Sequence, residues 1–137
     1  MGDYTVLKAA EAPEYTGGSD SPFFGYARPM ESQQIAFNVR VLAPGASHVA
    51  PGEDPTRGHS HNTIEEIYFV LDGTLDVKVG EDVVTLGKRD AVLIPAKTPR
   101  SARNHSSDEE VAFAMVSVKV ADQSTESVAH EAFWPTG

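Results

Sequence analysis

The chain has 137 residues, a formal net charge of −9 at pH 7 and no cysteine. This length corresponds to about one domain with a real hydrophobic core, and the lack of cysteine excludes disulfides, thiolate metal sites and cysteine nucleophiles. An acidic surface repels phosphate backbones and anionic lipids, so we expect neither nucleic acid nor membrane as a partner. A reducing, cytoplasmic location agrees with this composition.

Residues 1–32 are rich in proline, glycine, serine and aspartate and are predicted to form an irregular arm. Aromatic residues of the arm, such as Phe23 and Phe24, are expected to pack on the domain or on a partner subunit. From residue 35 to residue 42 the side chains alternate with a period of two, which predicts a strand. The sequence leaves open whether Asn38 and Arg40 face solvent or line the interior.

Further apolar or alternating runs between turn signals predict strands at residues 64–71, 74–79, 82–86, 90–95 and 110–120. In the last of these, Phe113 and Met115 are expected to face the interior, and the tail at 125–134 shows only a weak helical turn. Short strands separated by glycine and proline predict an all-β sandwich or barrel. We divide the chain into an arm (1–32), a barrel (33–122) and a tail (123–137) that packs on the barrel or on a partner subunit.

The strongest local signal lies in the segment GHSHNTIEE, which contains His59, His61 and Glu66. Residues two apart in a strand project from the same face, so the two imidazoles are expected side by side. Glu66 follows after a turn and can reach the same point from the returning strand. Two histidines and a carboxylate suit one divalent ion of Fe, Mn, Ni or Zn and leave positions open for water or substrate. The alternative is a pair of solvated loop histidines.

The order of these residues resembles the first motif of the cupin superfamily, a His-x-His, then Glu, then Gly. Four residues fall in place, namely His59, His61, Glu66 and Gly73. The second motif of the family is a Gly, then Pro-x-Gly, two residues, a His, three residues and an Asn. Gly87, Pro95 and Asn104 fit it, whereas Lys97 replaces the second Gly and Arg100 replaces the His. The resemblance covers about residues 35–120.

The resemblance implies a double-stranded β-helix (jelly-roll) barrel, usually a homodimer, with its site inside the barrel. It implies His59, His61 and Glu66 as metal ligands, without the fourth ligand of the family. Strand parity then places Glu65 on the outer surface and Tyr68 in the cavity together with Val70. On the same grounds Ile67, Phe69 and Leu71 face outward and would serve a sheet or subunit contact.

Three roles are open for Arg100, whose guanidinium stays protonated and has no lone pair for a metal. In the preferred hypothesis the three-ligand metal site survives, and Arg100 and Tyr68 act as catalytic residues of an oxygenase, isomerase or lyase. The substrate would be a small anionic molecule whose carboxylate Arg100 holds. In the alternative, Arg100 pairs with Glu66 in a metal-free, non-enzymatic module that binds a small ligand. In the third, Arg100 points outward in a basic run with Lys97 and Arg103.

Three further histidines lie outside the motifs. His48 belongs to a long link that ends at His59; this link can fold over the barrel mouth, but we expect His48 to be a solvated loop residue. His105 lies an odd number of residues after Arg100 and is therefore not expected to replace the missing ligand. His130, in the tail, is expected on the surface.

Overall fold

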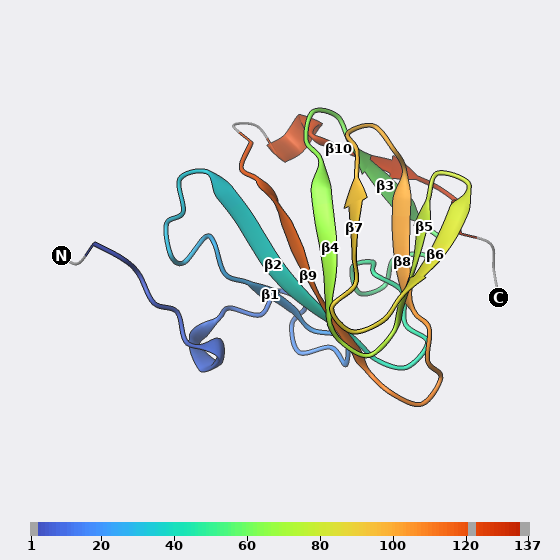
Figure 1. Ribbon diagram of the computed structural model, residues 1–137, viewed down its shortest axis with the longest axis horizontal. Coiled ribbons are helices and arrows are strands. Elements are labelled where there is room, and N and C mark those ends of the chain that lie inside the picture. Colours follow the sequence, from blue (N-terminus) through green and yellow to red (C-terminus); the bar gives the residue numbers. More distant parts are fainter. Residues whose placement is uncertain (1–2, 121–122, 135–137) are drawn as a thin grey trace.

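The computed structural model describes residues 3–120 and 123–134 (Figure 1). Within them, ten strands form two five-stranded antiparallel sheets that share one core. In spatial order the first sheet holds β1 (Phe23–Gly25), β2 (Ile35–Leu42), β9 (Val111–Val118), β4 (Glu66–Asp72) and β7 (Ala91–Ile94). The second sheet holds β10 (Ser127–His130), β3 (Gly58–His61), β8 (Arg100–Asn104), β5 (Leu75–Val79) and β6 (Asp82–Leu86). The prediction of an all-β jelly-roll barrel is confirmed.

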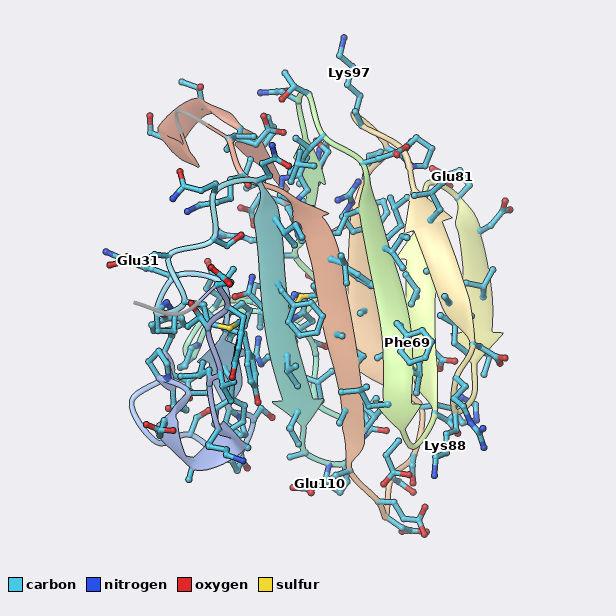
Figure 2. All side chains as sticks on the ribbon, turned by 60° about the vertical axis from the view of Figure 1, so that its left-hand side comes forward. Glu31, Phe69, Glu81, Lys88, Lys97 and Glu110 are labelled. Carbon is cyan, nitrogen blue, oxygen red and sulfur yellow. The ribbon has the colours of Figure 1, made fainter. Side chains whose placement is uncertain are left out.

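Alternation in β2 and β4 positions the interior of the barrel. Arg40 and Leu42 of β2 are buried, so the face that the sequence left open is the inner one. Tyr68 and Val70 of β4 are also buried, and Ile67 lies on the opposite, outer face. Figure 2 shows Phe69 on this outer face of the first sheet. These two strands therefore divide their side chains between core and surface as a period of two requires.

Three segments differ from the predicted elements. The arm is not wholly irregular, because β1 pairs with β2, and a short 3-10 helix, η1 (Ala9–Glu11), precedes it. The polar segment Arg100–Asn104 forms an inner strand of the second sheet. The tail forms a 3-10 helix, η2 (Gln123–Thr125), and then β10 in place of the weak helical turn. β10 is extended because its backbone pairs with the edge of β3.

The end of the tail lies on the outer face of the second sheet. Lys78 Nζ donates to the carbonyl of Phe133 at 2.5 Å and lies 4.2 Å from the centroid of that ring. The Arg103 guanidinium covers the ring of Trp134 at 4.7 Å. These contacts fix the tail on the barrel of its own chain. Residues 1–2 of the predicted arm, 121–122 of the barrel and 135–137 of the tail lie outside the described residues.

The outer face of the first sheet is partly apolar. Several apolar side chains are exposed on the outer face of the first sheet, among them Ile35, Ile67, Leu93 and Val118. They are the kind of surface that a second copy would cover, and the homodimer stays a prediction.

Neither 3-10 helix in residues 3–120 and 123–134 has the length or the apolar character needed to cross a membrane.

Candidate functional site: a histidine and glutamate cluster beside a buried arginine

His59 and His61 project from the same face of β3. Their ring centroids lie 5.1 Å apart, and the two planes are nearly perpendicular. Ser60, between them, points to the other face, where its hydroxyl contacts His130 Nε2 at 2.9 Å. The period of two in an extended chain therefore aims both imidazoles into the barrel.

Glu66 begins β4 and reaches the histidines from the facing sheet. Its Oε1 lies 3.6 Å from His61 Nε2. One potential ligand atom from each of His59, His61 and Glu66 lies within 4.8 Å of the other two. The structure thus brings together the three predicted ligands, and Glu65 beside them is exposed on the outer surface as parity requires.

Arg100 lies opposite His59 in the pairing of β8 with β3, and its side chain is 0% exposed. Its Nη1 donates to Glu66 Oε1 at 3.1 Å. Nη2 donates to the carbonyl of Pro95 at 3.0 Å, and Nε donates to that of Thr98 at 3.2 Å. Arg100 therefore points inward, and its guanidinium is bound by acceptors of the protein itself.

The outward orientation of Arg100 is thus wrong, and with it the basic patch. Lys97 is exposed and points away from the barrel in Figure 2, so it does not lie beside the Arg100 guanidinium. Arg103 faces the tail on the outer side of the sheet. Alternation along β8 separates Arg100 from Arg103 because an odd spacing places them on opposite faces.

His59 is neutral at pH 7. Burial, and after it the electrostatic effects of His61 and Arg100, lower its pKa to about 4. A neutral imidazole is the form that offers a lone pair to a metal.

The donor set fits a small divalent cation. Two imidazole nitrogens and one carboxylate oxygen bind such ions at about 2.0–2.2 Å and leave open positions. Next to this group, the hydroxyl of Tyr68 is buried and has no hydrogen-bond partner in the part of the chain that the structure describes. Burial and the Glu66 carboxylate raise the pKa of Tyr68, so it remains a neutral donor. This buried hydroxyl lies beside the Glu66 carboxylate, where it can donate to a further oxygen ligand.

Arg100 opposes a metal in this position, and Glu66 moderates the effect. At about 5 Å and an effective dielectric of about 20, the repulsion is about 3 kcal/mol per unit of metal charge. The Glu66 carboxylate contacts the guanidinium and belongs to the metal-ligand group, so it can offset both charges. The residues therefore fit a three-ligand metal site of reduced affinity.

Glu126 supports this cluster from the tail and was missed from the sequence. Its buried carboxylate accepts hydrogen bonds from the backbone N–H and the hydroxyl of Thr63, and its Oε2 lies 3.9 Å from His61 Nδ1. The contacts with Thr63 lower the pKa of Glu126, so it stays charged. The hydrogen-bond partner of His61 Nδ1 is the hydroxyl of Ser127 at 3.4 Å, and a polar partner on the far nitrogen of a ligand histidine fixes the orientation of its ring. No local pattern could have revealed it, because Thr63 and Glu126 lie 63 residues apart.

His48 is not the solvated loop residue that we expected. Its ring packs edge-on against Phe113 at 5.3 Å and stacks on Phe23 at 6.2 Å, measured between centroids. Burial and the charge of Arg40 hold its pKa well below the usual range. The long link folds over the barrel mouth because these aromatic rings offer it an apolar wall. His48 lies 6.4 Å from His59 between ring centroids, but it is not part of the three-residue group.

A cavity of about 320 Å³ opens on the cluster from the side of this link. Its walls include Tyr15, Phe23, Arg40, His48, Pro51 and His59. A second hollow of about 270 Å³ shares His48 and His59 with it. His59 is therefore the member of the cluster that a small molecule in the cavity meets first.

The remaining histidines differ in their outcome. His105 is 55% exposed and contacts the Asp76 carboxylate at 3.0 Å, so it does not replace the missing ligand, as expected. His130 is half-buried beside Phe133 and contacts Ser60, so it is less exposed than we expected.

Asn104 of the second motif is buried, and its amide nitrogen donates to the carbonyls of Leu42, Ala43 and Glu109.

Known structures share the architecture of this chain. A sugar phosphate isomerase of the cupin superfamily from Silicibacter pomeroyi has a TM-score of 0.73 at 14% identity, over 97% of each chain. A cupin protein from Bacteroides fragilis gives 0.67 at 20% identity, over 89% of each chain. Oxalate decarboxylase from Bacillus subtilis gives 0.68 at 16% identity, over 89% of this chain and 31% of that one. At these identities the likeness shows the fold alone.

Sequence comparison agrees with the architecture. An uncharacterized protein of Methanocaldococcus jannaschii is 34% identical over 59 residues, which cover 43% of this chain and 47% of that protein. The chain thus matches about half the length of this relative. The sequence profile of the cupin domain matches residues 45–117, more than half of the chain and both motifs. The chain belongs to the cupin domain family.

Proposed function

We propose that the protein binds one divalent metal ion through His59, His61 and Glu66 and acts with it on a small anionic molecule held in the adjoining cavity. The observation that carries the proposal is the convergence of three ligand atoms within 4.8 Å of one another. The neutral state of His59 supports it, since binding of the ion then displaces no proton there. When bound, such an ion supplies a Lewis acid that polarises a substrate oxygen.

The residues around the ligands have separate tasks in this proposal. Ser127 orients His61 through its 3.4 Å contact with Nδ1, the Glu126 carboxylate adds a negative charge 3.9 Å from the same nitrogen, and Arg100 holds Glu66 in place through the 3.1 Å contact. Tyr68, a neutral donor beside Glu66, can bond to an oxygen of the bound molecule. A substrate-holding role of Arg100 has no support in this geometry, because its side chain is fully buried and bound to Glu66, Pro95 and Thr98. Arg100 is instead a positioning residue.

An oxygenase, an isomerase and a lyase are all compatible with two histidines and a carboxylate around an open position. The similar structures include proteins named as oxalate decarboxylase and sugar phosphate isomerase, whose substrates are small and anionic. This agrees with a small anion as substrate and leaves the reaction class to be assayed.

Calorimetric titration of chelator-treated protein with Zn²⁺ and Mn²⁺ tests the metal site. We expect the wild type to bind one ion per chain, and we expect His59→Gln and His61→Gln to weaken binding by about 10-fold or more, because each removes a ligand. The matched control is His105→Gln, whose ring is exposed and bonded to Asp76. If the three substitutions had the same effect, the assigned ligands would be wrong.

A second candidate function is favoured by one contact, the buried pair of Arg100 and Glu66. In that case the guanidinium takes the place of the metal, and the barrel is a non-enzymatic module for a small ligand. Breaking a buried pair is costly, so the pair can persist against a metal.

The substitution Arg100→His separates the two candidates, because it restores the fourth ligand of the family motif. If the wild type has a metal site, both proteins bind Zn²⁺, and the variant binds it more tightly. If the barrel is metal-free, only the variant binds the ion.

A further inference from the structure

Arg40 is a second buried arginine, and it lies in the wall of the cavity. Its side chain comes from the inner face of β2, and the residue is 4% exposed. Nε donates to the carbonyl of Ser21 at 3.1 Å, and Nη2 donates to that of Val49 at 3.0 Å. Nη1 contacts His48 Nδ1 at 3.1 Å. Since a guanidinium carries five N–H groups, two remain for another acceptor.

None of these acceptors carries a negative charge. Within residues 3–120 and 123–134, Arg40 takes part in no ion pair. Glu14 attracts it at longer range, but the Glu14 carboxylate is bound by the backbone N–H groups of Thr16, Gly18 and Phe23. The acid in the cavity wall, Glu53, is paired with Arg57 at 2.6 Å. A buried cation without a counter-charge is unfavourable unless an anion completes it.

His48 adds a directed donor to this cation. Because the guanidinium can only donate, His48 Nδ1 must accept, and the proton of the neutral ring therefore sits on Nε2. Among the described residues, no hydrogen bond engages that N–H. Arg40 and His48 thus face the same cavity with unused donors.

We infer that Arg40 and His48 form an anion-binding subsite, which holds the carboxylate of a small organic acid in the cavity next to His59. The forked guanidinium can bind both carboxylate oxygens. Tyr15, Phe23 and Pro51 form the apolar part of the wall, which suits a carboxylate attached to a short apolar or flat body. The cavity of about 320 Å³ is large enough for a molecule of this size.

The subsite lies next to His59, one of the candidate metal ligands. The His48 ring bonds to Arg40 on one side and lies 6.4 Å from the ring of His59 on the other. An acid anchored on Arg40 therefore extends its remaining atoms towards His59. Delivery of a substrate to the cluster rests on the proposed metal site, whereas binding of the anion does not require a metal.

The test uses metal-free wild-type protein and four probes: benzoate, pyruvate and their uncharged amides, benzamide and pyruvamide, at constant ionic strength. We expect at least one acid to bind and its amide to bind about 10-fold more weakly or worse, because only the carboxylate completes the guanidinium. Arg40→Gln should weaken binding of that acid to the level of the amide. The matched control, Arg28→Gln, removes an exposed arginine outside this cavity wall and should bind the acid as the wild type does.

A measurement on the wild-type protein tests the subsite even if the Arg40→Gln variant does not fold. In protein with ¹⁵N-labelled histidine, the acid should shift the Nε2 resonance of His48 and leave that of exposed His105 unchanged. The subsite is overturned if neither acid binds at about 10 mM, a concentration well above the usual range for small ligands. It is also overturned if acid and amide bind alike, or if His48 does not respond. Because no metal is present, none of these failures bears on the metal site.

Discussion

Arg100 and Arg40 are both buried in one barrel and each makes three hydrogen bonds to the protein, yet their surroundings differ. Arg100 has a carboxylate partner, Glu66, and does not line the cavity next to His59. Arg40 has only carbonyl and imidazole acceptors and lines that cavity. The arginine in the altered motif is therefore suited to hold a ligand residue in place, and the arginine outside the motif is suited to hold a substrate. The role of each arginine is inferred from its counter-charge and from its access to the cavity, and not from its position in the sequence motif.

The largest effect is expected when Arg100 loses its counter-charge. Glu66→Gln keeps the shape of the side chain but leaves the buried guanidinium without a negative partner, which should lower the free energy of unfolding by about 3 kcal/mol. Urea denaturation of the metal-free protein measures it. Glu65→Gln is the control, since Glu65 is exposed and its loss should change stability by less than about 0.5 kcal/mol. Similar values for the two variants would contradict the pairing.

The two arginines can be compared directly by the same replacement. Arg100→Met and Arg40→Met each leave two carbonyls without their donor, but only Arg100→Met leaves a carboxylate unpaired. We expect Arg100→Met to be the more destabilising by about 2 kcal/mol at neutral pH without metal. If Arg40→Met were equally destabilising, the longer-range attraction of Glu14 for Arg40 would be worth as much as the direct contact of Arg100 with Glu66.

Acid should weaken the Arg40 side of the barrel through His48. The pKa of His48 is held well below 6.5 in the folded state, so the unfolded chain takes up this proton first as the pH falls. The contribution of neutral His48 is therefore complete above about pH 6.5 and is lost below it, by up to about 1.4 kcal/mol per pH unit. Between pH 7.5 and 5.5 the wild type should lose about 1 kcal/mol more stability than His48→Gln. If both proteins lost the same stability, His48 would be charged or solvated in the folded state.

The smallest effect concerns the turn that leads to Arg100. Lys97 stands where the family motif has glycine, and its φ is +70°, a left-handed conformation that disfavours a side chain. Its backbone N–H donates to the carbonyl of His61 at 2.6 Å, so the turn joins the two motifs. Lys97→Gly should raise the free energy of unfolding by about 0.5 kcal/mol, after the greater freedom of glycine in the unfolded chain is subtracted. Lys88→Gly, in a turn without positive φ at that residue, should instead lower it.

Much of the barrel was predictable because half-buried strands alternate visibly, as β2, β4 and β5 do. The strand β8 was not, since its buried face begins with Arg100, and a charged residue conceals the pattern. The three candidate ligands were predictable because their spacing is local. Arg40, His48 and Glu126 were not, because their roles depend on a folded link and on contacts between segments distant in sequence. For Arg40 the sequence offered one signal, a charged residue in a strand whose inner face could not be assigned. Its role could not be inferred without knowing which residues surround it in the fold.

We propose that His59, His61 and Glu66 hold a metal although Arg100 replaces the fourth ligand of the family. The most direct measurement is an anomalous difference map, at the absorption edge of the bound element, from crystals of protein purified without chelator. We expect one peak within about 2.0–2.3 Å of the three ligand atoms, with the Arg100 guanidinium still bound to Glu66. A cluster without an anomalous peak, in protein that carries less than about a tenth of a metal ion per chain, would contradict it.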